Sequence, residues 1–111
     1  MTSRVLAGPA TQIDSLPLPK DQLVAGAPNA GMLDFGTAGF ACGLWEHSEG
    51  VSTDVEADEV FVVLSGRARI EIVGQQDLEI EPGNVVLLEA GAETTWHVTE
   101  PLRKFWVTAT G

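Results

Sequence analysis

The sequence predicts a single all-β domain, a small sandwich or jelly roll, from three observations. Short apolar or alternating runs follow one another between turn signals, a pattern typical of β-rich domains. The run 15–23, SLPLPKDQL, contains two prolines and can form at most a short helical turn, and little else in the chain has a helical period. The length of 111 residues with 44% apolar content suits one globular domain that has its own core.

The expected strands differ in how many of their faces are apolar. They are residues 30–35, 40–47, 59–65, 67–73, 77–81, 84–90, 94–100 and 103–109. The run 67–73 alternates, which places Ala68, Ile70 and Ile72 on one face. The run 59–65 is apolar on both faces, and such a strand belongs in a sandwich or barrel, or beneath a subunit interface.

Glycine and proline separate these strands. Gly66 and Gly74 can supply the positive φ of tight reversals, and Pro82-Gly83 fits the centre of a type II turn. The first 29 residues are polar and rich in proline. We therefore expect residues 1–29 to form an N-terminal extension, able to contribute edge strands, and residues 30–111 to form the β domain.

Charge and composition exclude several classes of partner. Sixteen acidic residues against six basic ones give a net charge of −10, so neither nucleic acid nor a membrane is expected as a partner. The residues MTSRVLAGPATQ lack the apolar centre of a signal peptide, and no run approaches the ~20 apolar residues that cross a bilayer. Cys42 is the only cysteine, which excludes an internal disulfide and favours a reducing compartment. We expect a cytoplasmic protein.

The spacing of glycines and carboxylates resembles that of the cupin superfamily. Its first motif is Gly, five residues, His-any-His, three or four residues, Glu, six residues, Gly; Glu59 and Gly66 match the end of it. Gly83, five residues and then Glu-Ala-Gly at 89–91 resemble the start of the second motif. Sixteen residues separate Gly66 from Gly83, which suits the short connection of small cupins.

Two sequence segments restrict the resemblance to one branch of the superfamily. GLWEHSEG (43–50) and GAETTWHV (91–98) are similar to the small, poorly characterised cupins related to ureidoglycine aminohydrolase and the ethanolamine-utilisation cupins. The resemblance covers roughly residues 38–109. It implies a cupin jelly roll, a double-stranded β-helix. It also implies a homodimer, since cupins commonly pair sheets or exchange N-terminal strands.

The resemblance further implies a metal site, because typical cupins bind a divalent metal through three His and one Glu. The corresponding positions hold Glu59, then Thr53 and Val55 or Ser52 and Asp54, and finally Thr94. Only the glutamate remains, so no metal ligand and no cofactor is predicted. The alternative is a rebuilt site for Mn, Zn or Ni, or an oxygen-rich, Mg- or Mn-like site at Glu59 with Asp54 or Glu56.

The two histidines and the acidic run beside Glu59 are expected to be exposed. If Thr94 points into the barrel, the period of a strand sends His97 outward, unless a bulge reverses it. His47 and His97 are therefore predicted to be surface or rim residues. Asp54, Glu56, Asp58 and Glu59 are most simply a solvated acidic hairpin.

A pocket inside the barrel is expected instead of a metal site. Inward residues of facing strands would build it, and Trp offers a flat apolar face with one N–H donor. The expected ligand-binding residues are Trp45, Thr53, Phe61, Thr94, Trp96 and Trp106. Desolvation would raise the pKa of Glu59, which is the candidate catalytic acid or base, and Arg103 or Lys104 could neutralise it. Nothing in the sequence indicates a nucleophile with an adjacent base, and Cys42 is expected in the core.

Three functions remain open. The first is a small-molecule-binding cupin with a largely metal-free pocket centred on Glu59 and the tryptophans. The second is an enzyme with an atypical site, a lyase, isomerase or aminohydrolase acting on a small polar metabolite. The third is an accessory dimer with a filled barrel.

Overall fold

β-Strands are the dominant secondary structure of the chain, as the sequence predicts. The computed structural model describes residues 3–36 and 39–109. The elements are β1 (Leu16–Pro17), a 3-10 helix η1 (Lys20–Gln22), β2 (Leu23–Ala25), β3 (Asn29–Asp34), β4 (Phe40–His47), β5 (Gly50–Val55), β6 (Glu59–Ile72), β7 (Leu78–Ile80), β8 (Val85–Leu88) and β9 (Glu93–Ala109). No helix in this part of the chain is long and apolar enough to cross a membrane.

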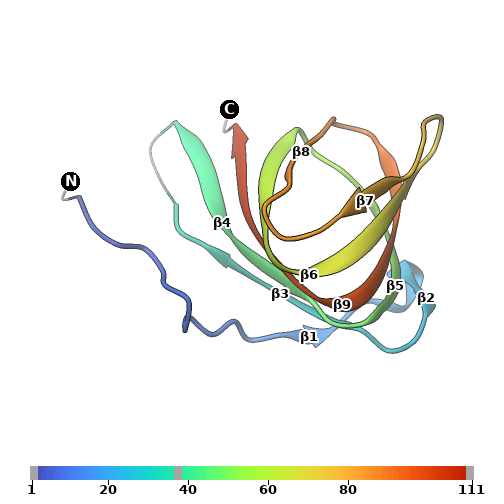
Figure 1. Cartoon of the computed structure of the whole chain (residues 1–111), viewed down its shortest axis with the longest axis horizontal. Helices are drawn as coiled ribbons and strands as arrows, with labels where there is room; N and C mark the ends of the chain where they lie inside the picture. Colours follow the sequence, from blue (N-terminus) through green and yellow to red (C-terminus); the bar gives the residue numbers. More distant parts are fainter. Residues whose placement is uncertain (1–2, 37–38, 110–111) are drawn as a thin grey trace.

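Two long strands, β6 and β9, organise the sheet. They pair with each other from Glu59 opposite Thr108 to Ile72 opposite Thr94. Along its other edge β9 pairs first with β5 and then with β4, so β4 and β5 lie in succession beside one strand. β7 and β8 pair with β6. The resulting sheet curls around the core, as Figure 1 shows, and confirms the predicted jelly roll.

The predicted breaks within the two long strands were wrong. Residues 59–65 and 67–73 belong to the single strand β6, and 94–100 and 103–109 belong to β9. Gly66 therefore makes no reversal; its φ of 89° accompanies shifts in the register of β6 against β9. A Cβ on Gly66 would lie 2.1 Å from the carbonyl oxygen of Pro101, so the two backbones meet here. A glycine allows both the bend and the close approach.

Strand β5 was missing from the predicted set. Its residues on the side of the core are Gly50, Ser52 and Asp54, which pair with Val98, Trp96 and Thr94 of β9. A glycine and two polar residues at these positions hide the apolar alternation by which a strand is recognised in a sequence. Pairing with β9 on one side and β2 on the other supplies the hydrogen bonds that hold β5 in place.

The N-terminal segment pairs with the edges of the barrel. β1 pairs with β3, and β2 pairs with β5. Before β1 the chain runs as an extended segment away from the barrel (Figure 1). Arg103 ties this segment to β9, because its guanidinium donates a 2.6 Å hydrogen bond to the carbonyl oxygen of Thr11.

The core lies between the two halves of the curled sheet. It consists of Phe61, Val63, Ala68, Ile70, Ile72, Ile80, Val86, Leu88, Trp96, Val98, Leu102 and Trp106. Cys42 is also buried, as expected. Residues of β6 and β9 supply most of this set, so the ladder between these strands also determines the packing of the interior.

Gly66→Ala tests the contact between β6 and β9. The new methyl group would meet the backbone of Pro101 and Leu102 and would also strain a positive φ. We expect a loss of about 2–5 kcal/mol in the free energy of unfolding, measured with urea. Gly74→Ala is the matched control: its φ is 87° and a Cβ there has nothing within 4 Å. It should lose only roughly 1–2 kcal/mol. Equal losses in the two variants would contradict the close approach.

Candidate functional site

The structure contains a cavity of about 370 Å³, a volume typical of small-ligand sites. Strands β3, β4, β5, β6 and β9 line it, together with residues of the N-terminal segment. Of the residues proposed from the sequence, those that line it are Trp45, Thr53, Glu59, Trp96 and Trp106. Phe61 and Thr94 are buried directly behind this lining, where they contact Trp96.

Lys104 and Glu59 form a buried ion pair beside this cavity. The ammonium of Lys104 lies 2.6 Å from Glu59 Oε2, and the side chains are 6% and 15% exposed. The same ammonium lies 4.4 to 4.9 Å from the ring centroids of Phe61, Trp45 and Trp96. Cation–π attraction and the carboxylate together compensate for the desolvation of this charge. Glu59 is therefore paired, and of the two basic residues considered from the sequence Lys104 is its partner.

Arg103 takes a different role because adjacent residues of a strand point to opposite faces. Its guanidinium forms an ion pair with Glu46. Glu46 pairs with Arg103 in the register of β4 and β9, on the face away from Lys104. Arg103 thus holds the N-terminal segment outside the barrel, while Lys104 faces the cavity.

Glu56 is a second carboxylate in the cavity. The prediction that it belongs to a solvated acidic hairpin was wrong. Its Oε2 accepts hydrogen bonds from the Thr94 hydroxyl at 2.7 Å and from the Trp96 indole N–H at 3.1 Å. Burial raises the pKa of Glu56; these two hydrogen bonds oppose the rise, Asp54 adds to it and Lys104 opposes it. The other oxygen, Oε1, has no hydrogen-bond partner among residues 3–36 and 39–109.

The signal that could have found Glu56 lies on β9 rather than beside Glu56. Thr94 and Trp96 share the inward face of β9, and both carry a polar hydrogen that needs an acceptor once it is buried. The acidic run at the end of β5 pairs with this part of β9 and is the nearest source of an acceptor. In the sequence alone, nothing separates the carboxylate that binds Thr94 and Trp96 from the three others within the same six residues.

His47 is almost fully buried, at 1% exposure, so the prediction of a surface or rim residue was wrong. It is the last residue of β4, and its ring lies 5.4 Å from that of Trp45. Nδ1 lies 2.6 Å from the carbonyl oxygen of Ser48, and Nε2 lies 2.8 Å from the hydroxyl of Ser52. Burial lowers the pKa of His47, against the raising effect of the Ser48 carbonyl. A neutral imidazole and a serine hydroxyl therefore meet at the cavity wall.

The burial of His47 could not be predicted from the residues next to it in the sequence. A single histidine at the end of a strand resembles a rim residue in any short sequence pattern. It is buried because the break between β4 and β5 turns the chain so that Ser48 and Ser52 satisfy both ring nitrogens. Turn geometry of this kind depends on the pairing of β4 and β5 with β9, which is a property of the whole sheet.

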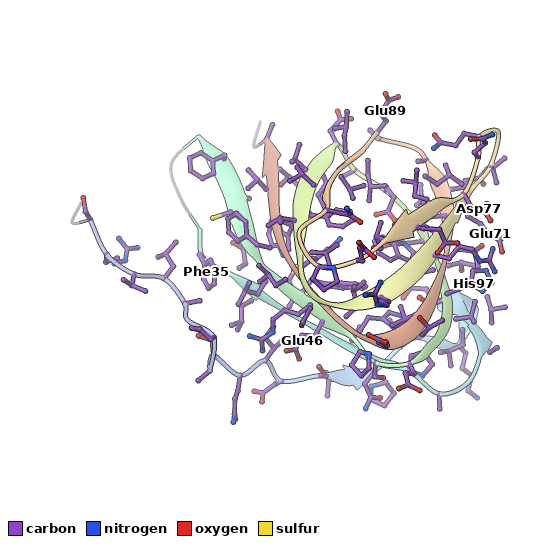
Figure 2. The ribbon with its side chains drawn as sticks, in the orientation of Figure 1. Phe35, Glu46, Glu71, Asp77, Glu89 and His97 are labelled. Carbon is purple, nitrogen blue, oxygen red and sulfur yellow. The ribbon has the colours of Figure 1, made fainter. Side chains whose placement is uncertain are left out.

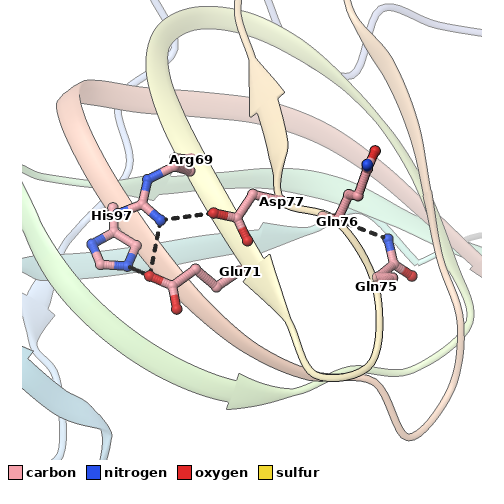
Figure 3. A network of polar contacts seen from close by, with 6 residues as sticks. All are labelled: Arg69, Glu71, Gln75, Gln76, Asp77 and His97. Atoms are coloured by element: carbon pink, nitrogen blue, oxygen red, sulfur yellow. Dashed lines mark hydrogen bonds and ion pairs between the residues drawn. The ribbon is translucent and has the colours of Figure 1, made fainter.

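His97 lies outside the barrel, as predicted. Its Nε2 is 2.5 Å from Glu71 Oε1, and Arg69 bridges Glu71 and Asp77 (Figure 3). The pKa of Glu71 is lowered by the hydrogen bonds from Arg69 and His97. Figure 2 places His97, Glu71 and Asp77 together at one side of the molecule, away from Glu46. This network belongs to the surface and contributes nothing to the cavity.

Comparison with known proteins identifies the family. The family model that describes the EutQ-like cupin domain matches residues 36–106 of this chain. The chain belongs to the EutQ-like cupins. No curated protein matches it.

Solved cupin structures share the fold at low sequence identity. The EutQ protein of Clostridium difficile has a TM-score of 0.72 and 21% identity over 91% of this chain and 82% of its own. A putative ethanolamine utilization protein Q from Salmonella typhimurium has a TM-score of 0.62 and 17% identity, covering 76% of this chain and 70% of its own. Ectoine synthase from P. lautus has a TM-score of 0.63 and 20% identity, covering 82% and 70%. At such identities the likeness concerns the fold.

The donors of this cupin do not suit the metal that is usual in the superfamily. The strand register places Ser52 and the exposed Asp54 on the cavity face of β5, opposite Trp96 and Thr94, so these two occupy the positions of the paired histidines. Thr53 pairs with Thr95 and lies on the other face of β5, at the rim of the cavity. A hydroxyl, a carboxylate and a threonine stand in for three imidazoles, and Glu59 already binds an ammonium. The described residues contain no group of three or more His, Cys, Asp or Glu that could hold a metal ion.

Lys104→Met tests the ion pair. It removes the ammonium and leaves the carboxylate of Glu59 without a partner in a largely buried position. We expect a loss of about 3 kcal/mol in the free energy of unfolding near neutral pH, with partial recovery in the double variant that adds Glu59→Gln. The control is Arg67→Met, which breaks an exposed pair with Glu81 and should cost less than about 1 kcal/mol. Losses that simply add in the double variant would contradict a coupled pair.

Glu56→Gln tests this half-buried carboxylate through its pH dependence. The folded-state pKa of Glu56 is raised above the ordinary value of 4.5, so protonation favours the folded state. That stabilisation is complete below 4.5 and is lost as the pH rises through the folded-state pKa. The glutamine variant, whose side-chain oxygen still accepts from Thr94 and Trp96, should therefore be at least as stable as the wild type at pH 7. We expect this advantage to disappear toward pH 4 in urea titrations; an advantage that grows as the pH falls would contradict the raised pKa.

Proposed function

We propose that this cupin binds a small polar molecule in the cavity, through a cationic or N–H group that donates to Glu56. The aromatic faces of Trp45 and Trp96 would contact the body of the ligand. The proposal relocates the centre of the pocket from Glu59 to Glu56. Glu59 is already paired with Lys104, whereas Glu56 has one carboxylate oxygen without a hydrogen-bond partner among the described residues.

The single observation that carries this proposal is the half-satisfied carboxylate of Glu56. Thr94 and Trp96 hold one of its oxygens, and the other has no partner in the described chain. Two donors on one oxygen fix the orientation of the group, which reduces the ordering cost of binding. Burial with a raised pKa means that its charge is incompletely compensated, so a positive ligand gains more here than at a solvated carboxylate.

The balance of charge in the cavity favours a cationic ligand. Asp54, Glu56 and Glu59 are three carboxylates, and Lys104 is the one amine among the described lining residues. Burial keeps the imidazole of His47 neutral near pH 7, since its pKa is lowered. The whole chain, with its net charge of −10, attracts cations in the same sense.

An enzyme is the second candidate function, and the raised pKa of Glu56 favours it. A carboxyl whose pKa moves toward the working pH is suited to general acid–base catalysis. In this alternative, a lyase, isomerase or aminohydrolase, Glu56 takes the role that the sequence suggested for Glu59. The cavity argues against the third function, an accessory dimer with a filled barrel.

Thermal unfolding with small probes tests the binding proposal. We would compare primary amines with alcohols and carboxylates of matched size, such as 2-aminoethanol, 1,2-ethanediol and glycolate. Amines should raise the melting temperature of the wild type, corresponding to about 2.7 kcal/mol at 100 times Kd. Glu56→Gln should abolish this shift, and Glu89→Gln, at an exposed position (Figure 2), should retain it. Equal responses to all three classes, or an undiminished shift in Glu56→Gln, would refute the assignment.

A further inference from the structure

We propose that Ser52 is a nucleophile and His47 its general base, so that this cavity can transfer the acyl group of a small ester or amide. The inference rests on the proposed function, because Glu56 would hold the amine of the same ligand. It concerns two side chains that the binding proposal does not use. Both belong to the cavity lining, and both are held in place by strands that pair with β9.

The hydrogen bonds of His47 determine the direction of the bond to Ser52. A carbonyl oxygen only accepts, so the contact of Nδ1 with the Ser48 carbonyl requires a proton on Nδ1. In the neutral ring Nε2 then carries a lone pair, and the Ser52 hydroxyl must donate to it at 2.8 Å. The three groups form the sequence hydroxyl, imidazole and orienting acceptor. This is the arrangement that activates a serine.

The surroundings keep the base neutral and oriented. His47 is 1% exposed and packs against the ring of Trp45. Its lowered pKa leaves the imidazole unprotonated at neutral pH, the form that accepts a proton from serine. The backbone break between β4 and β5, at residues 48 and 49, brings the two side chains together across five positions of sequence.

The position of Ser52 connects it with the proposed ligand site. Ser52 pairs with Trp96 across β5 and β9, and the indole N–H of Trp96 binds Glu56. A ligand whose amine contacts Glu56 therefore extends along Trp96 toward Ser52. The ammonium of Lys104, although paired with Glu59, lines the same cavity and would add positive potential near an oxyanion. The substrate class is accordingly a small ester or amide that also carries an amine.

The proposed reaction has two steps, acylation of Ser52 and hydrolysis of the acyl-serine. Ser52 Oγ attacks the carbonyl carbon while its proton passes to His47 Nε2. The tetrahedral intermediate then collapses, the bond to the leaving alcohol or amine breaks, and the leaving group takes the proton from the imidazolium. In the second step water attacks the acyl-serine ester with the same base, which releases the carboxylic acid and restores the serine hydroxyl.

Covalent labelling tests the nucleophile without knowledge of the natural substrate. We would treat the full chain with phenylmethanesulfonyl fluoride and with p-nitrophenyl acetate, and locate the adduct by intact-mass and peptide mass spectrometry. One sulfonyl or acetyl group should appear on Ser52. Ser52→Ala should remove it, His47→Gln should slow it roughly 100-fold or more, and Ser65→Ala, an exposed serine, should label like the wild type.

A cysteine variant makes a negative result decisive. In Ser52→Cys, iodoacetamide should alkylate the new thiol if reagents reach this position. Absence of wild-type labelling overturns the assignment of Ser52 as a nucleophile in either case. If the thiol reacts, position 52 is accessible but its serine is not activated. If the thiol stays unreacted, position 52 is inaccessible to reagents. Labelling of wild type that persists in Ser52→Ala also overturns it. Amine-dependent thermal shifts that survive these results leave the binding proposal intact, so the two failures can be told apart.

Discussion

The antiparallel ladder between β6 and β9 is the constraint on which the rest of this cupin depends. Its register places Phe61 opposite Trp106 and Val63 opposite Lys104, which brings the ammonium close to Glu59 at the start of β6. The same ladder continues past Gly66 to the core residues of the second half. A side chain at Gly66 would force the strands apart and would disturb the core and the cavity together.

Lys104 explains how the barrel tolerates Glu59 without the histidines of other cupins. A largely buried carboxylate needs a cation or several donors. Here the cation is covalently part of β9, and three aromatic rings surround it. An internal ammonium meets no loss of translational freedom, in contrast to a bound ion. A cationic ligand beside Glu59 would have to compete with Lys104. Glu56, in contrast, keeps one carboxylate oxygen without a hydrogen-bond partner among the described residues.

The sequence predicts the fold better than the site because motif spacings describe backbone geometry. The distance from Glu59 to Gly66 correctly marks a cupin, yet it does not distinguish a reversal from a register shift inside one strand. Trp45, Trp96 and Trp106 line the cavity. The strand period suggests this direction for Trp96, two residues after Thr94. The partners of the polar groups could not be read in the same way. They join residues far apart along the chain, as in Glu56 with Thr94 and Lys104 with Glu59.

The polar groups of this cavity differ in how they are paired. The indole N–H of Trp106 is buried without a partner among the described residues. Lys104 and Glu59 compensate each other, and both ring nitrogens of His47 are occupied. Glu56, in contrast, keeps an oxygen without a partner in the described part of the chain. The hydroxyl of Ser52 donates its hydrogen to His47 and retains lone pairs, which are what a nucleophile uses. The two proposals therefore rest on different groups: the binding proposal places a cation at Glu56, and the acyl-transfer proposal makes Ser52 the group that attacks a carbonyl carbon.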